Sequence, residues 1–333
     1  MADTFRVGLT RDFLKADGSL GFGDIGLSLL EDAPGVSWEF MPASSGELKA
    51  EEIRGYDALL VLAPRISAAT LEGAERLAVI ARFGVGYDNV DVEACTRNDV
   101  LLTITPDGVR RPVAVSALAM LFALTHKLVE KDRLTREGRW SQKLDYMGTG
   151  LTGRTFGIVG FGNIGRELNQ LARPFGMRHV VYDPFVTPEQ AATADVERLE
   201  LDDLLTQSDF VVLCCALVPE THRLINAARL AKMKSTAYLI NVARGPIVDQ
   251  AALTEALRNR AIGGAALDVF EREPIDPQDP LLKLDNVLLA PHAICWTDEL
   301  FSGIGRDACR SILEVAAGRA PRHVVNRDAL ERE

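Results

Sequence analysis

Three charged side chains in the second half of this 333-residue chain could together move a proton beside a bound acid. They are Arg244 in "NVARGPIVD", Glu273 in "LDVFEREP" and His292 in "APHAICWT". Histidine, with a free pKa of about 6.5, suits proton transfer near neutral pH, and a neighbouring carboxylate would orient its ring. An arginine could hold a substrate carboxylate through two parallel hydrogen bonds. Taken alone, each also fits a plain role, as a surface cation, a solvated loop acid or a helix-cap residue.

A glycine pattern upstream of these residues could hold a phosphate. The stretch "GIVGFGNIGRELNQ" spaces Gly160, Gly162 and Gly165 as G-x-G-x-x-G, after an apolar run and before an amphipathic helix. In that context the glycines allow a tight turn, a close approach of the backbone to a pyrophosphate, and close packing of helix on strand. The N–H groups at the helix start near Asn163 then face the phosphates. A glycine turn without a ligand is the alternative.

An acidic residue follows the glycine pattern at the distance expected for a ribose contact. The run "RHVVYD" ends at Asp183, 18 residues after Gly165. A carboxylate there accepts hydrogen bonds from the adenosine ribose and repels a 2′-phosphate. The sequence therefore predicts NAD rather than NADP as the cofactor.

The elements that must position these residues alternate between strand-like and helix-like runs. Such alternation predicts an α/β fold with two doubly wound, parallel-sheet lobes, in which ligands bind beyond the carboxyl ends of the strands. Arg244, Glu273 and His292 each follow a predicted strand and should meet at one edge. The predicted strands are 5–9, 36–40, 57–62, 77–83 and 100–104, then 156–159, 178–183, 208–215, 236–243, 264–270 and 286–291. The predicted helices include 68–76, a long one over 113–136 after the breaker-rich 105–112, and a last one over 300–317.

Composition narrows the class of protein. Hydrophobic residues make up 47% of the chain and charged residues 25%, and the net charge is -10. This charge argues against a nucleic-acid partner, because polyanion binding needs clustered Lys and Arg. The five cysteines are scattered, and no His, Cys or acid spacing indicates a metal site. The N-terminus lacks a signal-peptide pattern, and the apolar run 113–124 is too short to span a bilayer, so we expect a cytoplasmic protein without a membrane partner.

Several motifs together resemble one enzyme family. "GFGNIG", "NVARGPIVD", "LDVFEREP" and "APHAICWT", with "RFGVGYDNVD" in the first lobe, closely resemble the NAD-dependent D-isomer-specific 2-hydroxyacid dehydrogenases, such as phosphoglycerate dehydrogenases and glyoxylate/hydroxypyruvate reductases. The resemblance implies interconversion of a D-2-hydroxy acid and its 2-keto acid. It implies that Arg244 binds the substrate's carboxylate and carbonyl, and that Glu273 pairs with His292, the acid/base.

The resemblance also implies an arrangement and a set of binding residues. It implies a Rossmann NAD-binding domain, 110–298, inserted in a flavodoxin-like substrate domain, 1–109 and 299–333. The backbone of Val85 and Gly86 would bind the substrate carboxylate, and the long helix after Pro112 would form a homodimer. The cofactor-binding positions that we expect are Gly160, Gly162, Asn163, Ile164, Gly165, Asp183, Cys215, Val242, Ala243, Asp268 and His292.

One departure from the family pattern and three arginines bear on substrate choice. Family members often have Gly and a small residue after the histidine, whereas this chain has Cys295 and Trp296. The indole could line the substrate site or pack between the lobes. Arg65, Arg110 and Arg111 could hold a second acidic group on the substrate, or could be solvated or pair with local acids.

Two functions from different classes fit these residues. The first is an NAD-dependent dehydrogenase acting on a 2-hydroxy acid. The second is an NAD-sensing, corepressor-like binding protein with little turnover, because the corepressor branch of the family keeps the triad. The sequence does not name the acid.

Overall fold

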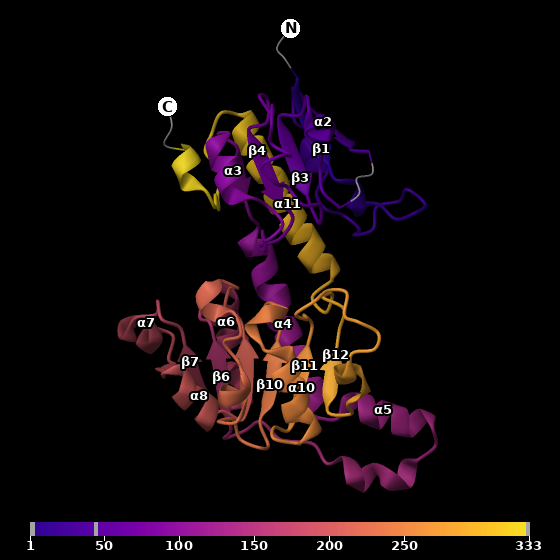
Figure 1. Ribbon diagram of the computed structural model, residues 1–333, viewed down its shortest axis with the longest axis vertical. Helices are drawn as coiled ribbons and strands as arrows, with labels where there is room; N and C mark the ends of the chain where they lie inside the picture. Colours follow the sequence, from indigo (N-terminus) through magenta and orange to yellow (C-terminus); the bar gives the residue numbers. More distant parts are fainter. Residues whose placement is uncertain (1–3, 43–45, 331–333) are drawn as a thin grey trace. The chain divides into compact units, whose positions relative to one another are not determined.

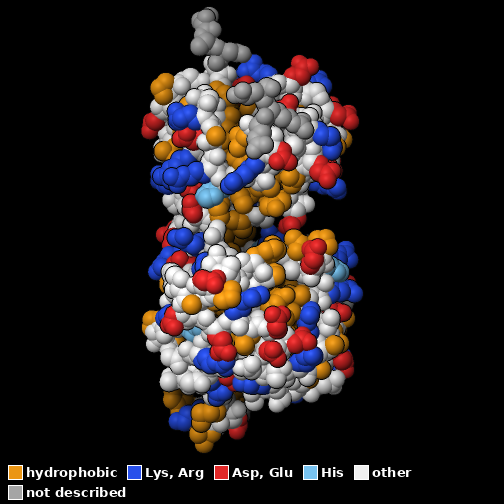
Figure 2. Space-filling model, turned by 90° about the vertical axis from the view of Figure 1, so that its left-hand side faces the viewer, with side chains coloured by type: hydrophobic (Ala, Val, Ile, Leu, Met, Phe, Trp, Pro, Cys, Tyr) orange, Lys and Arg blue, Asp and Glu red, His pale blue; other side chains and the backbone are white. Residues whose placement is uncertain are grey.

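The structure, a computed structural model, describes residues 4–42 and 46–330 (Figure 1). The chain divides into two compact units. Unit 1 combines the segment up to Pro112 with the segment from Trp296 onward, and unit 2 covers Val113–Cys295. On the face drawn in Figure 2, acidic and basic side chains are interspersed, in keeping with a surface that carries both signs of charge.

Unit 1 is built on a five-stranded parallel sheet with the strand order β2-β1-β3-β4-β5. Short buried runs form its inner strands, as in β3, where all four residues are buried. Its strands are β1 (Phe5–Leu9), β2 (Val36–Phe40), β3 (Ala58–Val61), β4 (Val79–Arg82) and β5 (Leu101–Thr103). Its helices are α1 (Ser28–Glu31), α2 (Ala50–Ile53), α3 (Val92–Arg97) and α11 (Asp298–Ala316).

Unit 2 is built on a seven-stranded parallel sheet with the order β12-β11-β10-β9-β6-β7-β8. The strands are β6 (Thr155–Val159), β7 (Arg178–Tyr182), β8 (Glu197–Arg198), β9 (Phe210–Leu213), β10 (Tyr238–Asn241), β11 (Gly264–Leu267) and β12 (Val287–Leu289). The helices are α5 (Leu128–Arg136), α6 (Asn163–Ala172), α7 (Pro188–Thr193), α8 (Leu201–Gln207), α9 (Ala227–Leu230) and α10 (Gln250–Arg258). The predicted α/β class with two parallel sheets is therefore confirmed.

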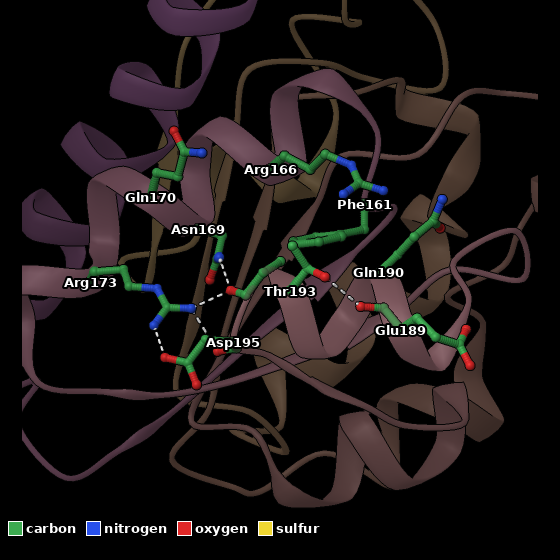
Figure 3. Close-up of a pocket in the computed structure, with 10 residues that line it drawn as sticks. Phe161, Arg166, Asn169, Gln170, Arg173, Glu189, Gln190, Thr193 and Asp195 are labelled. Carbon is green, nitrogen blue, oxygen red and sulfur yellow. Dashed lines mark hydrogen bonds and ion pairs between the residues drawn. The ribbon is translucent and has the colours of Figure 1, made fainter.

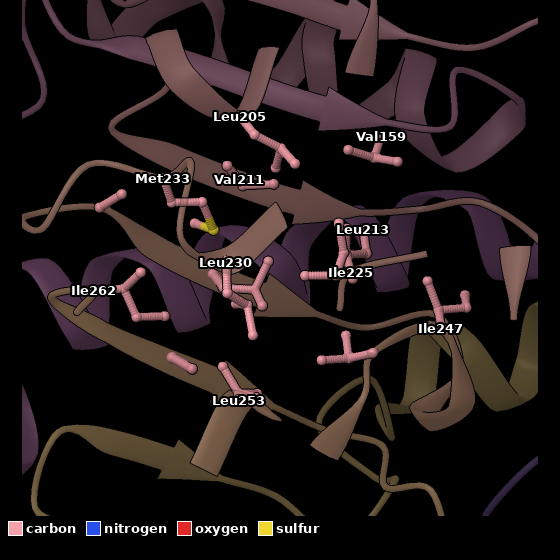
Figure 4. Close-up of a cluster of buried hydrophobic side chains, with 14 of the residues drawn as sticks. Val159, Leu205, Val211, Leu213, Ile225, Leu230, Met233, Ile247, Leu253 and Ile262 are labelled. Carbon is pink, nitrogen blue, oxygen red and sulfur yellow. The ribbon is translucent and has the colours of Figure 1, made fainter. Parts of the chain in front are cut away.

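The sheet of unit 2 is buried on both faces, which explains its continuous apolar strands. In β9, Val211 and Leu213 enter one core cluster while Phe210 and Val212 enter the other. Figure 4 shows the first cluster, where side chains of the strands meet Leu205 of α8 and Leu253 of α10. Both cores hold the strand ends in fixed register.

Two helix predictions were wrong in their details. Residues 68–76 form consecutive turns rather than a helix, because Gly73 adopts a left-handed conformation with φ of +71°. The long predicted helix is two helices, α4 (Pro106–Thr125) and α5, separated by Lys127 at φ of 54°. Residues 106–112 of the supposed breaker segment are the first turns of α4. Pro106 is the first residue of the helix, where a proline loses no hydrogen bond, and Pro112 lies inside the helix.

Helix α4 is long and apolar enough to cross a membrane by length and composition. However, 61% of its most apolar window is buried inside the protein. A mostly buried helix of this kind is typical of the core of a soluble protein.

Candidate active site

His292 and Glu273 form a hydrogen-bonded pair at the carboxyl edge of the seven-stranded sheet. His292 follows β12 and Glu273 follows β11, the neighbouring parallel strand. The Nδ1 of His292 lies 2.6 Å from Oε2 of Glu273. The imidazole side chain is 46% exposed, and no described residue bonds its other nitrogen, Nε2. The pair can therefore exchange a proton with a ligand through Nε2 while the carboxylate fixes the ring.

The carboxylate of Glu273 is held in its charged form by its surroundings. Burial raises its pKa, but the hydrogen bond with His292, the N–H of Phe270 and the charge of Arg244 outweigh that effect and lower the pKa overall. The N–H of Phe270 donates to Oε1 at 3.0 Å. One oxygen is thus bound by the backbone and the other by the histidine, so the carboxylate cannot rotate freely.

Arg244 is positioned by the turn that follows β10. Asn241, the last residue of β10, donates through Nδ2 to the Arg244 carbonyl at 3.0 Å and accepts the N–H of Ala243 at 3.0 Å. The next residue, Gly245, packs so closely on the Phe270 backbone that a Cβ there would lie 1.9 Å from its carbonyl carbon. The loop of Arg244 is therefore seated on the loop of Glu273. Sequence reasoning missed Asn241, although a buried amide at the end of an apolar strand is a usable signal.

Asp268, the first residue after β11, holds the turn that contains His292. Its Oδ1 accepts the N–H groups of Ala293 at 2.9 Å and Ile294 at 3.1 Å. His292 has a left-handed φ of 54°, which a non-glycine residue adopts only when its surroundings fix it. Burial raises the pKa of Asp268. The two N–H donors act in the opposite direction but do not outweigh burial. Asp268 was expected to bind the cofactor, and its fixing of the histidine turn was not foreseen.

The glycine pattern forms a tight turn between β6 and α6. Gly160 has φ of +92°, and a Cβ on it would lie 2.5 Å from the backbone nitrogen of Cys215. A Cβ on Gly165 would lie 2.2 Å from the carbonyl oxygen of Gly160, whereas one on Gly162 would meet nothing within 4 Å. The first and third glycines therefore allow close packing, and the second leaves the backbone at the start of α6 open. This cradle fits a pyrophosphate.

Asp183, directly after β7, lies next to that turn. Its Oδ2 accepts the N–H of Phe161 at 2.7 Å, and its Oδ1 accepts the N–H of Phe185 at 2.9 Å. The carboxylate is thus fixed beside the glycine loop, where a ribose hydroxyl would reach it.

The remaining predicted cofactor positions lie on the same edge. Asn163 and Ile164 are the first residues of α6, and Val242 and Ala243 follow β10. Cys215 follows β9, and burial raises the pKa of its thiol to about 11. Burial likewise raises the pKa of Cys295 to about 11, so neither thiol is a ready nucleophile near neutral pH.

In unit 1, Val85 and Gly86 lie in a loop at the carboxyl end of β4. The loop begins at Gly84, whose φ is +129° and whose N–H donates to Oγ1 of Thr105 at 3.0 Å. Asn89 closes it by donating to the Pro64 carbonyl at 2.8 Å. The loop is therefore fixed at both ends, and Val85 and Gly86 within it are half-buried.

The predicted substrate-binding arginines and tryptophan lie at exposed positions of unit 1. Arg65 follows β3 in the segment that Asn89 holds, and Arg110 and Arg111 lie in the early turns of α4. Trp296 precedes α11 and is 53% exposed.

A separate pocket lies beside α6, on the side of α7, and has a volume of about 550 Å³ (Figure 3). Phe161 and Arg166 line it, with the guanidinium of Arg166 lying 5.0 Å from the centroid of the Phe161 ring. Arg173 and Asp195, which form an ion pair, line it as well. The pocket touches the glycine turn through Phe161 but contains none of Arg244, Glu273 and His292.

Comparisons with known proteins show which family and which structures this chain is similar to. The model of the family described as "D-isomer specific 2-hydroxyacid dehydrogenase, NAD binding domain" matches residues 118–293. A glyoxylate reductase of Thermococcus onnurineus is 41% identical over 300 residues, which are 88% of this chain and 90% of the relative. The crystal structure of the TT0316 protein of Thermus thermophilus is 34% identical, with a TM-score of 0.85 over 96% of this chain and 99% of that one. A D-lactate dehydrogenase of Aquifex aeolicus, complexed with NAD and lactic acid, is 26% identical, with a TM-score of 0.81 over 98% and 97% of the two chains.

Proposed function

Because the chain belongs to the D-isomer-specific 2-hydroxyacid dehydrogenases and is an NAD-dependent enzyme, we propose that His292 is the acid/base of a reaction between a D-2-hydroxy acid and its 2-keto acid. The observation that carries the proposal is the 2.6 Å contact between Nδ1 of His292 and Oε2 of Glu273. Because Nδ1 is bound to Glu273, Nε2 of the half-exposed ring is available to exchange a proton with the substrate oxygen.

The proton route follows from this pair. In the reducing direction, His292 gives its proton to the carbonyl oxygen at C2, and in the oxidising direction it takes the hydroxyl proton. The charged carboxylate of Glu273 stabilises the imidazolium form that precedes reduction. The bound nicotinamide supplies or receives the hydride at C2.

The substrate's own acid group needs a partner of opposite charge. Arg244 follows β10, the strand that pairs with β11, and its charge acts on Glu273. We assign it to the carboxylate and carbonyl of the substrate, which a planar guanidinium binds in a fixed orientation. For unit 1, we propose that the N–H groups of Val85 and Gly86 bind a carboxylate.

The residues that would hold NAD are those of the glycine turn and its neighbours. The N–H groups at Gly162, Asn163, Ile164 and Gly165 would face the pyrophosphate, and Asp183 would accept the ribose hydroxyls. Cys215, Val242, Ala243 and Asp268 would line the remainder of the cofactor, together with His292.

The test is NADH oxidation with a panel of keto acids, namely glyoxylate, hydroxypyruvate, phenylpyruvate and a phosphorylated keto acid. We expect turnover of at least one by the wild type, and a loss of about a thousandfold or more in kcat for His292→Ala. NADH binding to this variant, followed by fluorescence, should stay near that of the wild type. Near-normal turnover by His292→Ala would refute the assignment. Negligible turnover of every keto acid by the wild type would favour the NAD-sensing alternative.

We further propose that the enzyme is a cytoplasmic homodimer that pairs through α4 and the segment after it. Large apolar side chains of this region are strongly exposed in the single chain, including Leu128 at 60%, Trp140 at 67% and Leu144 at 76%. Exposed apolar groups in such number favour a protein partner. Sedimentation of the purified protein as a monomer would contradict this.

The role of Arg65, Arg110 and Arg111 stays a prediction. If one of them holds a second acidic group on the substrate, its replacement by alanine should raise the KM for that substrate. An unchanged KM in all three variants would exclude the acidic group.

A further inference from the structure

The segment 271–279, which carries Glu273, is an irregular loop between β11 and the short 3-10 helix Pro280–Lys283. Its residues 272–274 are exposed, so core packing does not hold them. A loop stays mobile unless its backbone is anchored. The position of the Glu273 carboxylate therefore depends on what binds the two ends of this segment.

The side-chain amide of Gln250 binds both ends of this loop. Its Oε1 accepts the N–H of Glu271 at 3.1 Å, and its Nε2 donates to Oδ2 of Asp279 at 2.8 Å. The other oxygen of Asp279 accepts the N–H of Leu281 at 2.9 Å, at the start of the 3-10 helix. One amide thus bridges the first and the last residue of the loop.

Gln250 is itself anchored by a helix. It is half-buried and is the first residue of α10, which Asp249 caps by accepting the N–H of Ala252 at 3.0 Å. The carbonyl of Gln250 accepts the hydroxyl of Thr254 at 2.7 Å. The amide therefore extends from a fixed point of unit 2 toward the loop.

The bridge requires an amide, because its two partners have opposite roles. A peptide N–H only donates, and the ionised carboxylate of Asp279 only accepts. A glutamate at position 250 would accept the N–H of Glu271 but would place a like charge beside Asp279. A methionine would keep the length of the side chain and form neither hydrogen bond. Glutamine is thus matched to both ends of the loop.

We propose that Gln250 is a positioning residue for the proposed acid/base pair, and that its bridge keeps the carboxylate of Glu273 at Nδ1 of His292. The inference rests on the proposed function. Glu271, which the amide binds, lies two residues before Glu273. The 2.6 Å contact between Glu273 and His292 tolerates little movement, because a lengthening of about 1 Å takes it out of hydrogen-bond range.

The first experiment compares steady-state kinetics of Gln250→Met with the wild type on a keto acid that the wild type reduces. We expect kcat to fall about tenfold, because a misplaced catalytic group slows the reaction. KM should change less than about twofold, since Asn241 and not this amide holds the loop of Arg244.

A second background shows whether the loss passes through Glu273. In Glu273→Ala no carboxylate is left to position, so adding Gln250→Met should lower kcat by less than about twofold. An equal tenfold fall in both backgrounds would mean that Gln250 acts elsewhere, and the inference would be overturned.

An exchange of the two partners tests the bridge itself. Gln250→Glu should lose at least as much kcat as Gln250→Met. In Gln250→Glu/Asp279→Asn the introduced carboxylate accepts both the N–H of Glu271 and the introduced amide, whose oxygen still accepts the N–H of Leu281. This double variant should return to within about threefold of the wild-type kcat. A double variant with the urea midpoint of the wild type but no more activity than Gln250→Glu would overturn the inference.

Gln190→Met is the matched control. Gln190 also accepts a backbone N–H at the start of a helix, that of Thr187 at 3.1 Å. Its helix, α7, lies between β7 and β8 in the chain, at the end of the sheet opposite to β11 and β12. Gln190→Met should leave kcat unchanged. A fall as large as that of Gln250→Met would show a general effect of removing an amide from unit 2 and would contradict the proposal.

A spectroscopic measurement separates failure of this inference from failure of the proposed function. The carboxylate of Glu273 keeps the proton of the neutral His292 ring on Nδ1. Nitrogen NMR shifts, assigned by their loss in His292→Ala, should show this tautomer in the wild type and a mixture of tautomers in Gln250→Met. A mixture that the double variant reverses would support the positioning even in a protein that reduces no keto acid. The wild-type tautomer in Gln250→Met would overturn it even in an active enzyme.

Discussion

The carboxyl edge of the seven-stranded sheet carries ionisable side chains, whereas that of the five-stranded sheet carries a fixed loop and aromatic rings. In unit 2, Arg244, Glu273 and His292 follow three adjacent strands. In unit 1, the loop at Gly84 follows β4, and an aromatic cluster packs beside it, made of Phe13, Phe22, Phe83, Trp296 and Phe301. Both edges have the same parallel architecture, so the fold alone does not explain the difference.

The difference separates two tasks. Proton transfer needs a titratable group whose orientation and charge are set by neighbours, as Glu273 and Asp268 set those of the His292 turn. Holding a substrate needs N–H groups in fixed positions, which a backbone loop provides. On this interpretation, changes at the Glu273–His292 pair should act mainly on kcat, and changes in the loop at Gly84 mainly on KM.

The sharpest test of the unit 2 half of the comparison is Glu273→Gln. The amide keeps the size of the side chain but removes the negative charge that favours the protonated imidazole. We expect kcat for keto acid reduction to fall by about a hundredfold. Steady-state rates of keto acid reduction by the variant and the wild type measure this effect.

Glu271→Gln provides the control for this change. Glu271 lies two residues away and pairs with Arg223 at 3.3 Å instead of with the histidine. It should leave kcat and its pH profile as they are. If Glu273→Gln changed KM alone, the assignment of proton transfer to unit 2 would have to be abandoned.

The sequence predicted which side chains lie together in unit 2 better than in unit 1, for a physical reason. Strand order in a parallel α/β sheet follows from chain connectivity, so residues after neighbouring strands can be expected to meet, as His292 and Glu273 do. The aromatic cluster joins residues 13, 22, 83, 296 and 301, and its contacts depend on the path of a long loop and on helix packing. No local pattern encodes these contacts.

The errors in secondary structure have a similar origin. Residues 68–76 have helical propensity, but Gly73 and the surrounding turns follow the path between two strands instead. The interruption of the long helix at Lys127 is also invisible locally, since lysine is a good helix former. Asp268 was identified as a site residue, yet its two hydrogen bonds to the backbone after His292 became evident only in three dimensions.

The unit 1 half of the comparison can be tested with Gly84→Ala. The φ of +129° is unfavourable for any residue with a Cβ, although the side chain itself would meet nothing closer than 3.6 Å. The loop should therefore shift, with a loss of about 1–3 kcal/mol in stability and a rise in KM for the keto acid of about tenfold. We expect kcat to change less than KM, which steady-state kinetics and chemical denaturation would show.

Gly73→Ala is the matched control for Gly84→Ala. It has a comparable positive φ of +71° in the same unit and open space around the position, but it lies outside the loop. It should lower stability without raising KM. An equal rise in KM in both variants would mean that strain anywhere in unit 1 affects binding, and the special role of the loop would be lost.

The smallest expected effect concerns His179, a histidine at the opposite, amino end of the sheet in unit 2. It is 8% exposed in β7, its Nδ1 lies 2.5 Å from Oδ1 of Asn169, and its Nε2 has no hydrogen-bond partner among the described residues. Burial, and secondly the charge of Arg173, lower its pKa.

In the unfolded chain, His179 gains a proton near pH 6.5, whereas the folded protein resists protonation of this residue until a lower pH. Its contribution to stability is therefore complete above pH 6.5 and is lost as the pH falls toward the folded pKa, by at most about 1.4 kcal/mol per pH unit.

Urea unfolding between pH 7.5 and 5 measures how the free energy of unfolding falls with pH. The fall should be smaller in His179→Gln and unchanged in His222→Gln, which alters an exposed histidine of the same unit. Because His179 lies at the amino end, kcat of His179→Gln should follow the pH profile of the wild type. A shifted profile would mean that proton chemistry in unit 2 is not confined to the carboxyl edge.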